Sequence, residues 1–174
     1  MLEVLLGTKK EARAFTLIEI LILITIIIIL AVIVVIIVNP AKIVEKSRDS
    51  SRISDLASIS TAINLYLADN RDLNSLTNSK VYESISGTRK NDGTGWIPLN
   101  FTTITSGAPL SVLPIDPKNN QASGLFYRFG VNPASKTYEI DCILESSENT
   151  AKQSSDGGNN NSRYEIGTDL TILP

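Results

Sequence analysis

Residues 15 to 38 read FTLIEILILITIIIILAVIVVIIV, and this stretch decides the fold. Between Ile20 and Val38 every residue is apolar except Thr25, whose hydroxyl can donate to a carbonyl of the preceding helical turn. At about 1.5 Å per residue, the run matches the roughly 30 Å hydrocarbon core of a bilayer. Its many Ile and Val residues favour a strand in water, but a single span in lipid must satisfy its own backbone hydrogen bonds. We therefore expect residues 15–38 to form a transmembrane helix.

The composition excludes most familiar kinds of active site. The 174-residue chain has a formal net charge of −2, one cysteine, Cys142, and no histidine. The lack of histidine removes Ser-His-Asp and Cys-His nucleophile systems and HExxH metal sites. The chain also lacks the GxGxxG and GxxxxGK(S/T) loops that bind nucleotide phosphates, and its charge does not support nucleic-acid binding. We expect no enzymatic activity, because no spacing selects a catalytic pair among the acids Asp116, Glu139, Asp141 and Asp169.

A compact basic cluster, Lys9, Lys10 and Arg13, precedes the apolar run. Such residues favour the cytoplasmic side of a membrane, although further basic residues between positions 42 and 52 weaken the asymmetry. The apolar run is longer than the core of a secretory signal peptide, and no small-residue cleavage site follows it. We therefore expect a single-pass protein of the cytoplasmic membrane, with a cytoplasmic N-terminal leader and an extracytoplasmic C-terminal head.

Glu19 is the single carboxylate inside the apolar stretch. An ionised carboxylate at the centre of a span costs about 2.5–3.5 kcal/mol and less near the interface. Glu19 therefore needs a partner or a proton, or it reaches the interface as a snorkelling side chain.

Residues 9–14, KKEARA, and the five that follow, Phe15-Thr16-Leu17-Ile18-Glu19, together resemble the prepilin processing site of type IV pilins and pseudopilins. In that family a membrane aspartyl peptidase cuts before the Phe, whose new amine is usually N-methylated. The resemblance implies cleavage between Ala14 and Phe15 and methylation of Phe15. Ala14 replaces the more common Gly, so we expect slower cleavage. The resemblance also implies that Glu19 pairs with the N-terminal ammonium of a neighbouring subunit and fixes the axial register of the helices.

The implied function is that of a structural subunit of a type IV pilus or a related pseudopilus. Its implied partners are other copies or other pilins, prepilin peptidase, and an assembly platform with its ATPase. The final location would be an extracellular pilus or a pseudopilus of the cell envelope. The alternative is a single-span membrane protein whose extracellular head binds a ligand and never polymerises.

Asn39 and Pro40 end the aliphatic run and allow two readings. Either Pro40 kinks a continuous helix, or Asn39 caps a second helix that begins with Pro40. Apolar residues then recur every three or four positions, which predicts an amphipathic helix over residues 39–69. Its charged first turns are typical of a solvated face, with contacts between subunits as the alternative. The apolar positions are Ile53, Leu56, Ile59, Ile63 and Leu67, and the charged ones are Lys42, Glu45, Lys46, Arg48, Asp49, Arg52 and Asp55.

Residues 70–174 carry the signals of a small β-rich head. Residues 70–113 show no sustained period and are interpreted as a connecting loop with short elements. Residues 113–117, LPIDP, are similar to a segment before the sheet of major pseudopilins, and a rigid proline turn explains them equally well. Alternation then predicts half-buried strands over 125–131, 137–144 and 163–172. The first two form a hairpin through residues 132–136, with Cys142 facing the core.

The expected fold is therefore α+β and pilin-like: a long N-terminal helix, transmembrane in its first half, packs on a small C-terminal antiparallel sheet. Its segments are a leader over 1–14, the span over 15–38, an amphipathic segment over 39–69 and a globular head over 70–174. We expect no cofactor and no metal site. Because major pseudopilins bind calcium near their C-terminus, the alternative is a calcium loop, although Asx-rich turns are common without metal and the loop lacks the EF-hand pattern. Its candidate ligands are Asp156, Asn159, Asn161 and Asp169.

Overall fold

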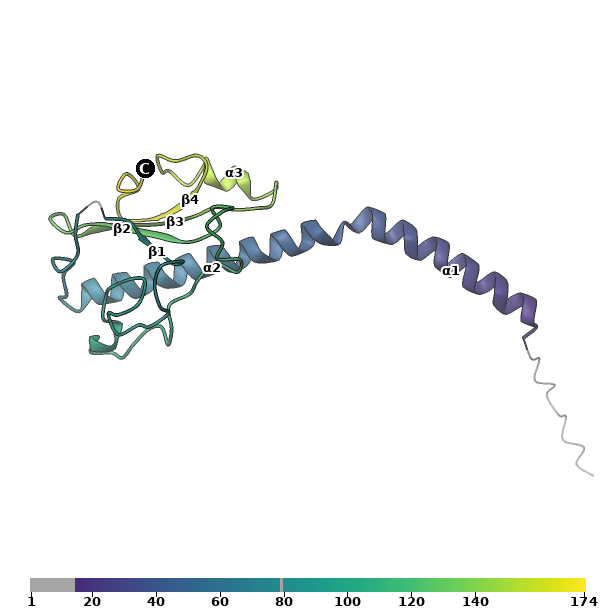
Figure 1. The fold of residues 1–174 in the computed structure, drawn as a ribbon, viewed down its shortest axis with the longest axis horizontal. Coiled ribbons are helices and arrows are strands. Elements are labelled where there is room, and N and C mark those ends of the chain that lie inside the picture. Colours follow the sequence, from purple (N-terminus) through teal and green to yellow (C-terminus); the bar gives the residue numbers. More distant parts are fainter. Residues whose placement is uncertain (1–14, 79) are drawn as a thin grey trace, which may run out of the picture. The chain divides into compact units, whose positions relative to one another are not determined.

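The structure, a computed structural model, describes residues 15–78 and 80–174 (Figure 1). The predicted leader lies outside these residues. The described chain is α+β and separates into two compact units, one that ends at Pro40 and one formed by Ala41–Pro174. In chain order its elements are α1 (Leu17–Val38), α2 (Pro40–Ala68), β1 (Tyr82–Glu83), a 3₁₀ turn (Phe101–Thr103), β2 (Arg128–Asn132), β3 (Thr137–Cys142), α3 (Thr150–Gln153) and β4 (Tyr164–Gly167).

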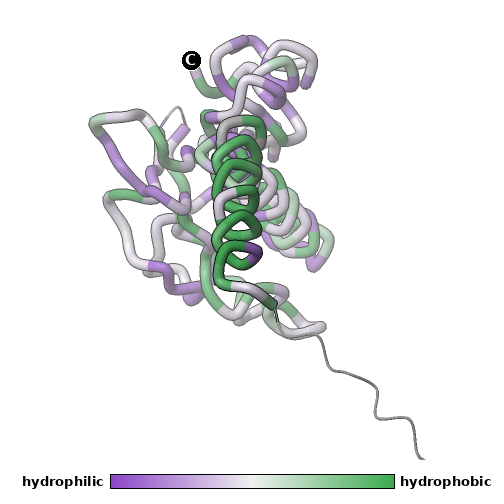
Figure 2. The backbone as a smooth tube through the Cα atoms, turned by 90° about the vertical axis from the view of Figure 1, so that its right-hand side faces the viewer, coloured by the Kyte–Doolittle hydropathy of each residue, from purple (hydrophilic) through white to green (hydrophobic). Residues whose placement is uncertain are grey.

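Helix α1 confirms that the apolar stretch is helical. Residues Leu17–Val35 have a mean hydropathy of 3.5, and by length and composition α1 can cross a membrane. Figure 2 shows hydrophobic residues along this helix. Thr25 Oγ1 donates to the Leu21 carbonyl at 2.6 Å, so the one hydroxyl of the run is satisfied within the helix, as its position predicts.

The chain forms two helices around Asn39. Helix α1 ends at Val38, and Asn39 is its C-cap in the left-handed region, at φ 43° and ψ 80°. Asparagine tolerates this conformation better than most residues. Pro40 then opens α2, where its missing N–H and fixed φ do no harm. This boundary agrees with the reading that places Pro40 at the first position of a second helix.

The apolar face of α2 is confirmed. Leu56, Ile59 and Ile63 are fully buried, and Ile53 and Leu67 pack against the same core. That core also contains one face of the sheet and parts of the connecting loop. Its larger members include Trp96, Leu99, Phe101, Leu113, Tyr127, Phe129, Tyr138, Ile140 and Cys142.

The sheet has four antiparallel strands in the order β1-β2-β3-β4. The predicted hairpin is confirmed as β2 and β3, with Phe129 opposite Ile140 and Val131 opposite Tyr138. Strand β1, at the edge, lies within the segment that the sequence indicated as a loop with short elements. Cys142 is buried, as expected from its register.

The third predicted strand is shorter than expected, and its outer face is not exposed. Strand β4 ends at Gly167 rather than at residue 172, because the Thr168 and Asp169 amides both turn to the Tyr138 carbonyl, at 2.9 and 3.4 Å. The expectation of half-buried strands is wrong for β3 and β4, since Glu139, Asp141 and Glu165 are buried on the face away from the core. In Figure 1, α2 lies on one side of the sheet, and α3 with the last residues of the chain lies on the other.

Candidate functional site

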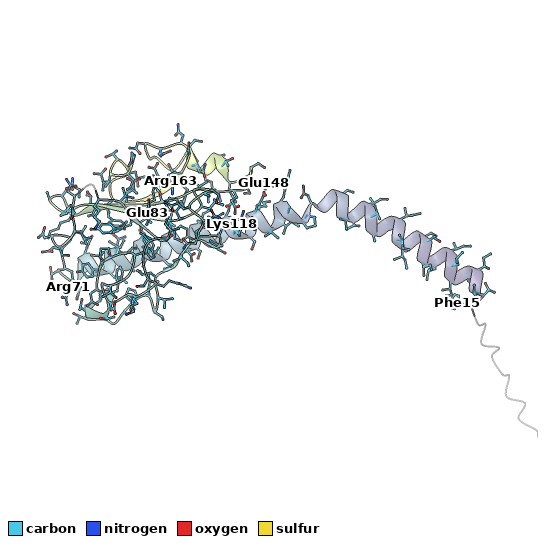
Figure 3. The ribbon with its side chains drawn as sticks, in the orientation of Figure 1. Phe15, Arg71, Glu83, Lys118, Glu148 and Arg163 are labelled. Carbon is cyan, nitrogen blue, oxygen red and sulfur yellow. The ribbon has the colours of Figure 1, made fainter. Side chains whose placement is uncertain are left out.

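The surface of α1 is the most unusual feature of the described chain. Every α1 side chain whose burial is described is exposed, including Leu17 at 85%, Ile28 at 58% and Ile33 at 46% (Figure 3). Soluble monomers rarely expose contiguous apolar patches larger than a few hundred Å². The helix therefore requires an external apolar environment, which lipid or the helices of other subunits can supply.

Phe15 and Glu19 stand at the start of this helix. Phe15 is 73% exposed and directly precedes Thr16, the N-cap residue; Ala14, the other residue of the predicted cleavage site, lies outside the described residues. The Thr16 amide donates to Glu19 Oε2 at 3.4 Å, and the Glu19 amide donates to Thr16 Oγ1 at 3.3 Å. These two bonds form a capping box, so Glu19 has a local partner that the sequence reasoning missed. The Thr-x-x-Glu spacing was the signal that could have found it.

The capping box leaves the Glu19 carboxylate able to bind a second group. A carboxylate has about four acceptor positions, and the cap uses one of them. The amides of the first helical turn also make this end of α1 favourable for negative charge. The geometry is therefore compatible with an ammonium group from another chain, in addition to the cap.

Arg52 lies at the centre of a buried ionic cluster, which we call the Arg52 cluster: Asp49, Arg52, Asp116 and Glu145. Arg52 Nε contacts Asp116 Oδ2 at 2.5 Å, and Arg52 Nη1 contacts Asp49 Oδ1 at 2.9 Å and Glu145 Oε2 at 2.8 Å. The side chains of Arg52, Asp49 and Asp116 are fully buried. The interpretation of the charged α2 turns as a solvated face is therefore wrong for Asp49 and Arg52, because their partners come from the head.

The cluster is completed by groups at its edge. Arg48 Nε contacts Glu145 Oε2 at 2.6 Å, and Lys118 also binds Glu145. Burial raises the pKa of Glu145, but hydrogen bonds from Arg48, Lys118 and Arg52 outweigh it and lower that pKa to about 2. Burial likewise opposes ionisation of Asp49, whose pKa is nevertheless lowered by bonds from Glu145 and Ser146.

The Arg52 cluster fixes the head on α2. The Asp49 carboxylate accepts the amides of Glu145 and Ser146, both at 2.8 Å, just after β3. Two tyrosines add further links: Tyr127, directly before β2, donates through Oη to Asp55 at 2.8 Å, and Tyr138 Oη of β3 lies 2.8 Å from Ser60 Oγ. Helix α2 and the sheet are thus joined by polar bonds as well as by the apolar core.

Sequence reasoning missed this cluster because its members are far apart in the chain. Arg52 lies 64 residues from Asp116 and 93 from Glu145. Two signals were present: Arg52 directly precedes the apolar stripe of α2, and Asp116 is the carboxylate of the LPIDP segment.

The two aspartates among the candidate calcium ligands accept hydrogen bonds from backbone amides. Asp156 accepts the amides of Gly158 at 3.0 Å and Glu165 at 2.8 Å, and Asp169 accepts the Thr171 amide at 3.2 Å. Asn159 and Asn161 are exposed. Within the described residues, no group of three or more His, Cys, Asp or Glu side chains could hold a metal ion.

Comparison with known proteins gives this chain no relative. No family model matches the sequence, no curated protein matches it, and no solved structure matches its fold.

Proposed function

We propose that this chain is a filament subunit of the type IV pilin and pseudopilin class. The observation that carries the proposal is the exposed apolar surface of α1, which begins with Phe15 and the capping-box residue Glu19. The chain would enter the cytoplasmic membrane through α1, lose its leader at Ala14, and be extracted into a filament. There the α1 helices of neighbouring subunits would replace the lipid.

The position of Glu19 favours assembly over simple anchoring. The cap alone needs only an acceptor, which a neutral Gln also supplies, so capping does not account for a full charge at the start of a membrane anchor. Aliphatic helices that pack side by side have little to fix their axial positions. A charge pair between Glu19 and the Phe15 ammonium of a neighbour would define that position, because a misplaced pair leaves a charge uncompensated in an apolar bundle.

The head fits the same role. Helix α2 belongs to the compact unit of the head and is fastened to it by the Arg52 cluster. A force applied to α2 during extraction would therefore act on the whole folded head. The partners in this proposal are other copies or other pilins, prepilin peptidase, and an assembly platform with its ATPase.

The decisive test is the N-terminus of the protein from cells that contain prepilin peptidase. Intact mass and N-terminal sequencing should show a chain that begins at Phe15 and carries one added methyl group. The variant Ala14→Gly should be processed faster than the wild type. A full-length leader on the membrane-inserted protein, in the presence of active peptidase, would refute the proposal and favour a single-span protein with a ligand-binding head.

A further inference from the structure

The outer face of the sheet, opposite the core, carries an unusual concentration of acids. We define this face by Arg128 and Gly130 of β2, Glu139 and Asp141 of β3, and Glu165 and Gly167 of β4. It is covered by residues 154–163 and by the last seven residues, 168–174, which we call the C-terminal strap. The Ile172 and Leu173 amides of the strap both donate to Glu139 Oε2 at 2.8 Å.

Glycine makes room for the strap. Leu173 is 1% exposed and packs over Gly130. A Cβ atom at Gly130 would lie 2.7 Å from Leu173 Cδ2, which is closer than real contacts allow. The strap therefore lies directly against the sheet, and the acids beneath it are shielded from water.

Asp141 is compensated by two cations. Arg128 binds both carboxylate oxygens of Asp141, and Arg163 Nε lies 2.6 Å from its Oδ1. Arg163 also lies over the Phe126 ring, 5.6 Å from its centroid. These two arginines are thus already engaged by one carboxylate.

Neither Glu139 nor Glu165 forms an ion pair within the described residues, and Arg128, which pairs with Asp141, acts on Glu139 only through its charge at longer range. Glu139 is opposite Gly167 and Glu165 is opposite Asp141, so the two glutamates are diagonal neighbours on one face and within reach of each other. They are 0% and 3% exposed. Glu165 Oε2 accepts the Asn160 amide at 3.1 Å, but the Oε1 atoms of both glutamates lack a hydrogen-bond partner in the described chain.

Two adjacent buried carboxylates cannot both remain ionised at low cost, since each loses its hydration and repels the other. A single proton removes the repulsion, and it lets one Oε1 donate to the other, which satisfies both orphan atoms at once. The direction of the Glu139 pKa agrees: burial, followed by the hydrogen bond with the Glu165 carboxyl, raises it to about 8.

We propose that Glu139 and Glu165 share one proton between their Oε1 atoms, and that this proton holds the C-terminal strap and the 154–163 loop on the sheet. The Oε2 atoms remain acceptors for the strap and for the loop. Loss of the proton would leave two charges in contact beneath the strap, so one side chain must move out. Glu165 has a route, because it lines a cavity of about 440 Å³ between α3 and β4.

The charged groups around the pair do not replace the proton. Arg128 and Arg163 form their ion pairs with Asp141, and Arg128 attracts Glu139 without pairing with it. The Asp156 carboxylate accepts the Glu165 amide. Lys152 lines the same cavity as Glu165, where it would stabilise Glu165 once ionised. Charged groups on this sheet face, or on the elements around it, are Glu83 from β1, Arg128 from β2, Asp141 from β3, Lys152 from α3, Asp156 and Arg163 from the loop, and Asp169 from the strap.

The shared proton determines whether the stability of the head rises or falls with pH. Because the folded pair binds its proton more tightly than the unfolded chain does, the head should lose stability as pH rises from about 5 to about 8. The unfolding equilibrium constant should increase by up to about tenfold per pH unit across that window. Above it, the strap should be released before the rest of the sheet.

The test uses the full chain in detergent micelles. Infrared spectra near pH 6.5 should show the C=O band of one protonated carboxyl group that is shielded from solvent, and the band should disappear as pH passes about 8. Amide exchange at Ile172 and Leu173, corrected for intrinsic rates, should lose at least about tenfold protection over the same range. The absence of the band in the folded wild type would overturn the proposal without any variant.

Glutamine variants test whether the two glutamates share a proton or only pack against each other. Glu165→Gln places a permanent N–H donor next to Glu139 Oε1, so it should abolish the band and keep the strap protected above pH 8. Glu148→Gln, which removes an exposed acid whose side chain is 64% accessible, should change neither result. A Glu165→Gln protein with the wild-type pH dependence would contradict the proposal.

A cation bound between the two glutamates would give the opposite dependence of stability on pH. If the two glutamates held calcium, stability would increase with pH, and a chelator would release the strap. Exchange at Ile172 and Leu173 should instead be the same with calcium and with chelator. A chelator effect would overturn the shared proton, and it would leave the proposed filament function untouched.

Discussion

Arg52 on α2 and Asp116 before β2 form a buried two-point ion pair, with Arg52 Nε 2.5 Å from Asp116 Oδ2 and Arg52 Nη2 3.1 Å from Oδ1. Both side chains are fully shielded from solvent. The pair joins residues that are 64 positions apart in the chain. Its geometry suits a guanidinium and cannot be reproduced by an ammonium group.

Removal of the Arg52 side chain should therefore lower the free energy of unfolding far more than removal of an exposed cation. Arg52→Ala leaves two fully buried carboxylates, those of Asp49 and Asp116, without their common partner, so the free energy of unfolding should fall by about 3–5 kcal/mol. Lys46→Ala breaks an exposed pair with Glu148 and should cost less than about 1 kcal/mol. Denaturant titration of the full chain in detergent gives both values. Equal losses in the two variants would mean that the Arg52 cluster contributes little.

Glu145 should make the head sensitive to acid. Its folded pKa of about 2 is below the ordinary value of 4.5, so its ionisation stabilises the folded state above about pH 4.5. That contribution should decrease as pH falls from about 4.5 to about 2. Comparison of denaturation midpoints for wild type and Glu145→Gln should show a difference at pH 6 that narrows steadily towards pH 2. A difference that stays constant with pH would indicate that the charge of Glu145 does not contribute to the stability of the head.

The sequence predicted the parts of the fold that follow from local pattern. The uninterrupted apolar run requires α1, the three- and four-residue spacing gives the buried face of α2, and the alternation around residues 132–136 gives the β2–β3 hairpin. These elements are set by neighbours in the chain. Cys142 was placed in the core by the same period-two count.

The features that the sequence did not predict depend on contacts between residues far apart in the chain. Nothing local to Arg52 indicates that Asp116 will cover it, so a charged helix turn was interpreted as solvated. Likewise, Glu139 has the pattern of an outward-facing strand residue and is buried only because the strap returns over it. Of the candidate site, the sequence alone indicated Phe15 and Glu19, and the structure added the hydrogen bonds that place Glu19 in a capping box.

Three charges in the middle of α1 should prevent stable membrane insertion. Each central Lys disfavours insertion by about 2.5–3.5 kcal/mol, whereas each apolar residue favours it by about 0.3–0.6 kcal/mol, so one Lys is outweighed by the rest of the span. A variant with Lys at Ile24, Ile27 and Ile28 should fail to insert, and the matched variant with Leu at the same positions should insert as the wild type does. Alkaline extraction of isolated membranes, followed by immunoblotting, measures the fraction inserted. Unchanged insertion of the triple Lys variant would show that α1 is not the membrane anchor.

The two roles of Glu19, helix cap and charge, can be separated by substitution. Gln also completes a capping box, so Glu19→Gln keeps the cap and loses the charge. Thr16→Ala does the reverse: it weakens the cap by about 1 kcal/mol and keeps the charge. If Glu19 sets the register of neighbouring subunits, Glu19→Gln and Glu19→Ala should both reach the membrane and be cleaved at Phe15 but should form no filaments.

Thr16→Ala should still assemble under the same model, because the carboxylate remains available to a neighbouring ammonium. Assembly is measured by shearing filaments from the cell surface and by electron microscopy. The amount of unassembled subunit is measured in membrane fractions. The opposite pattern, in which Glu19→Gln assembles normally and Thr16→Ala does not, would assign Glu19 to the helix cap alone. The register contact would then have to come from the packing of the aliphatic α1 side chains, which carry no charge to define an axial position.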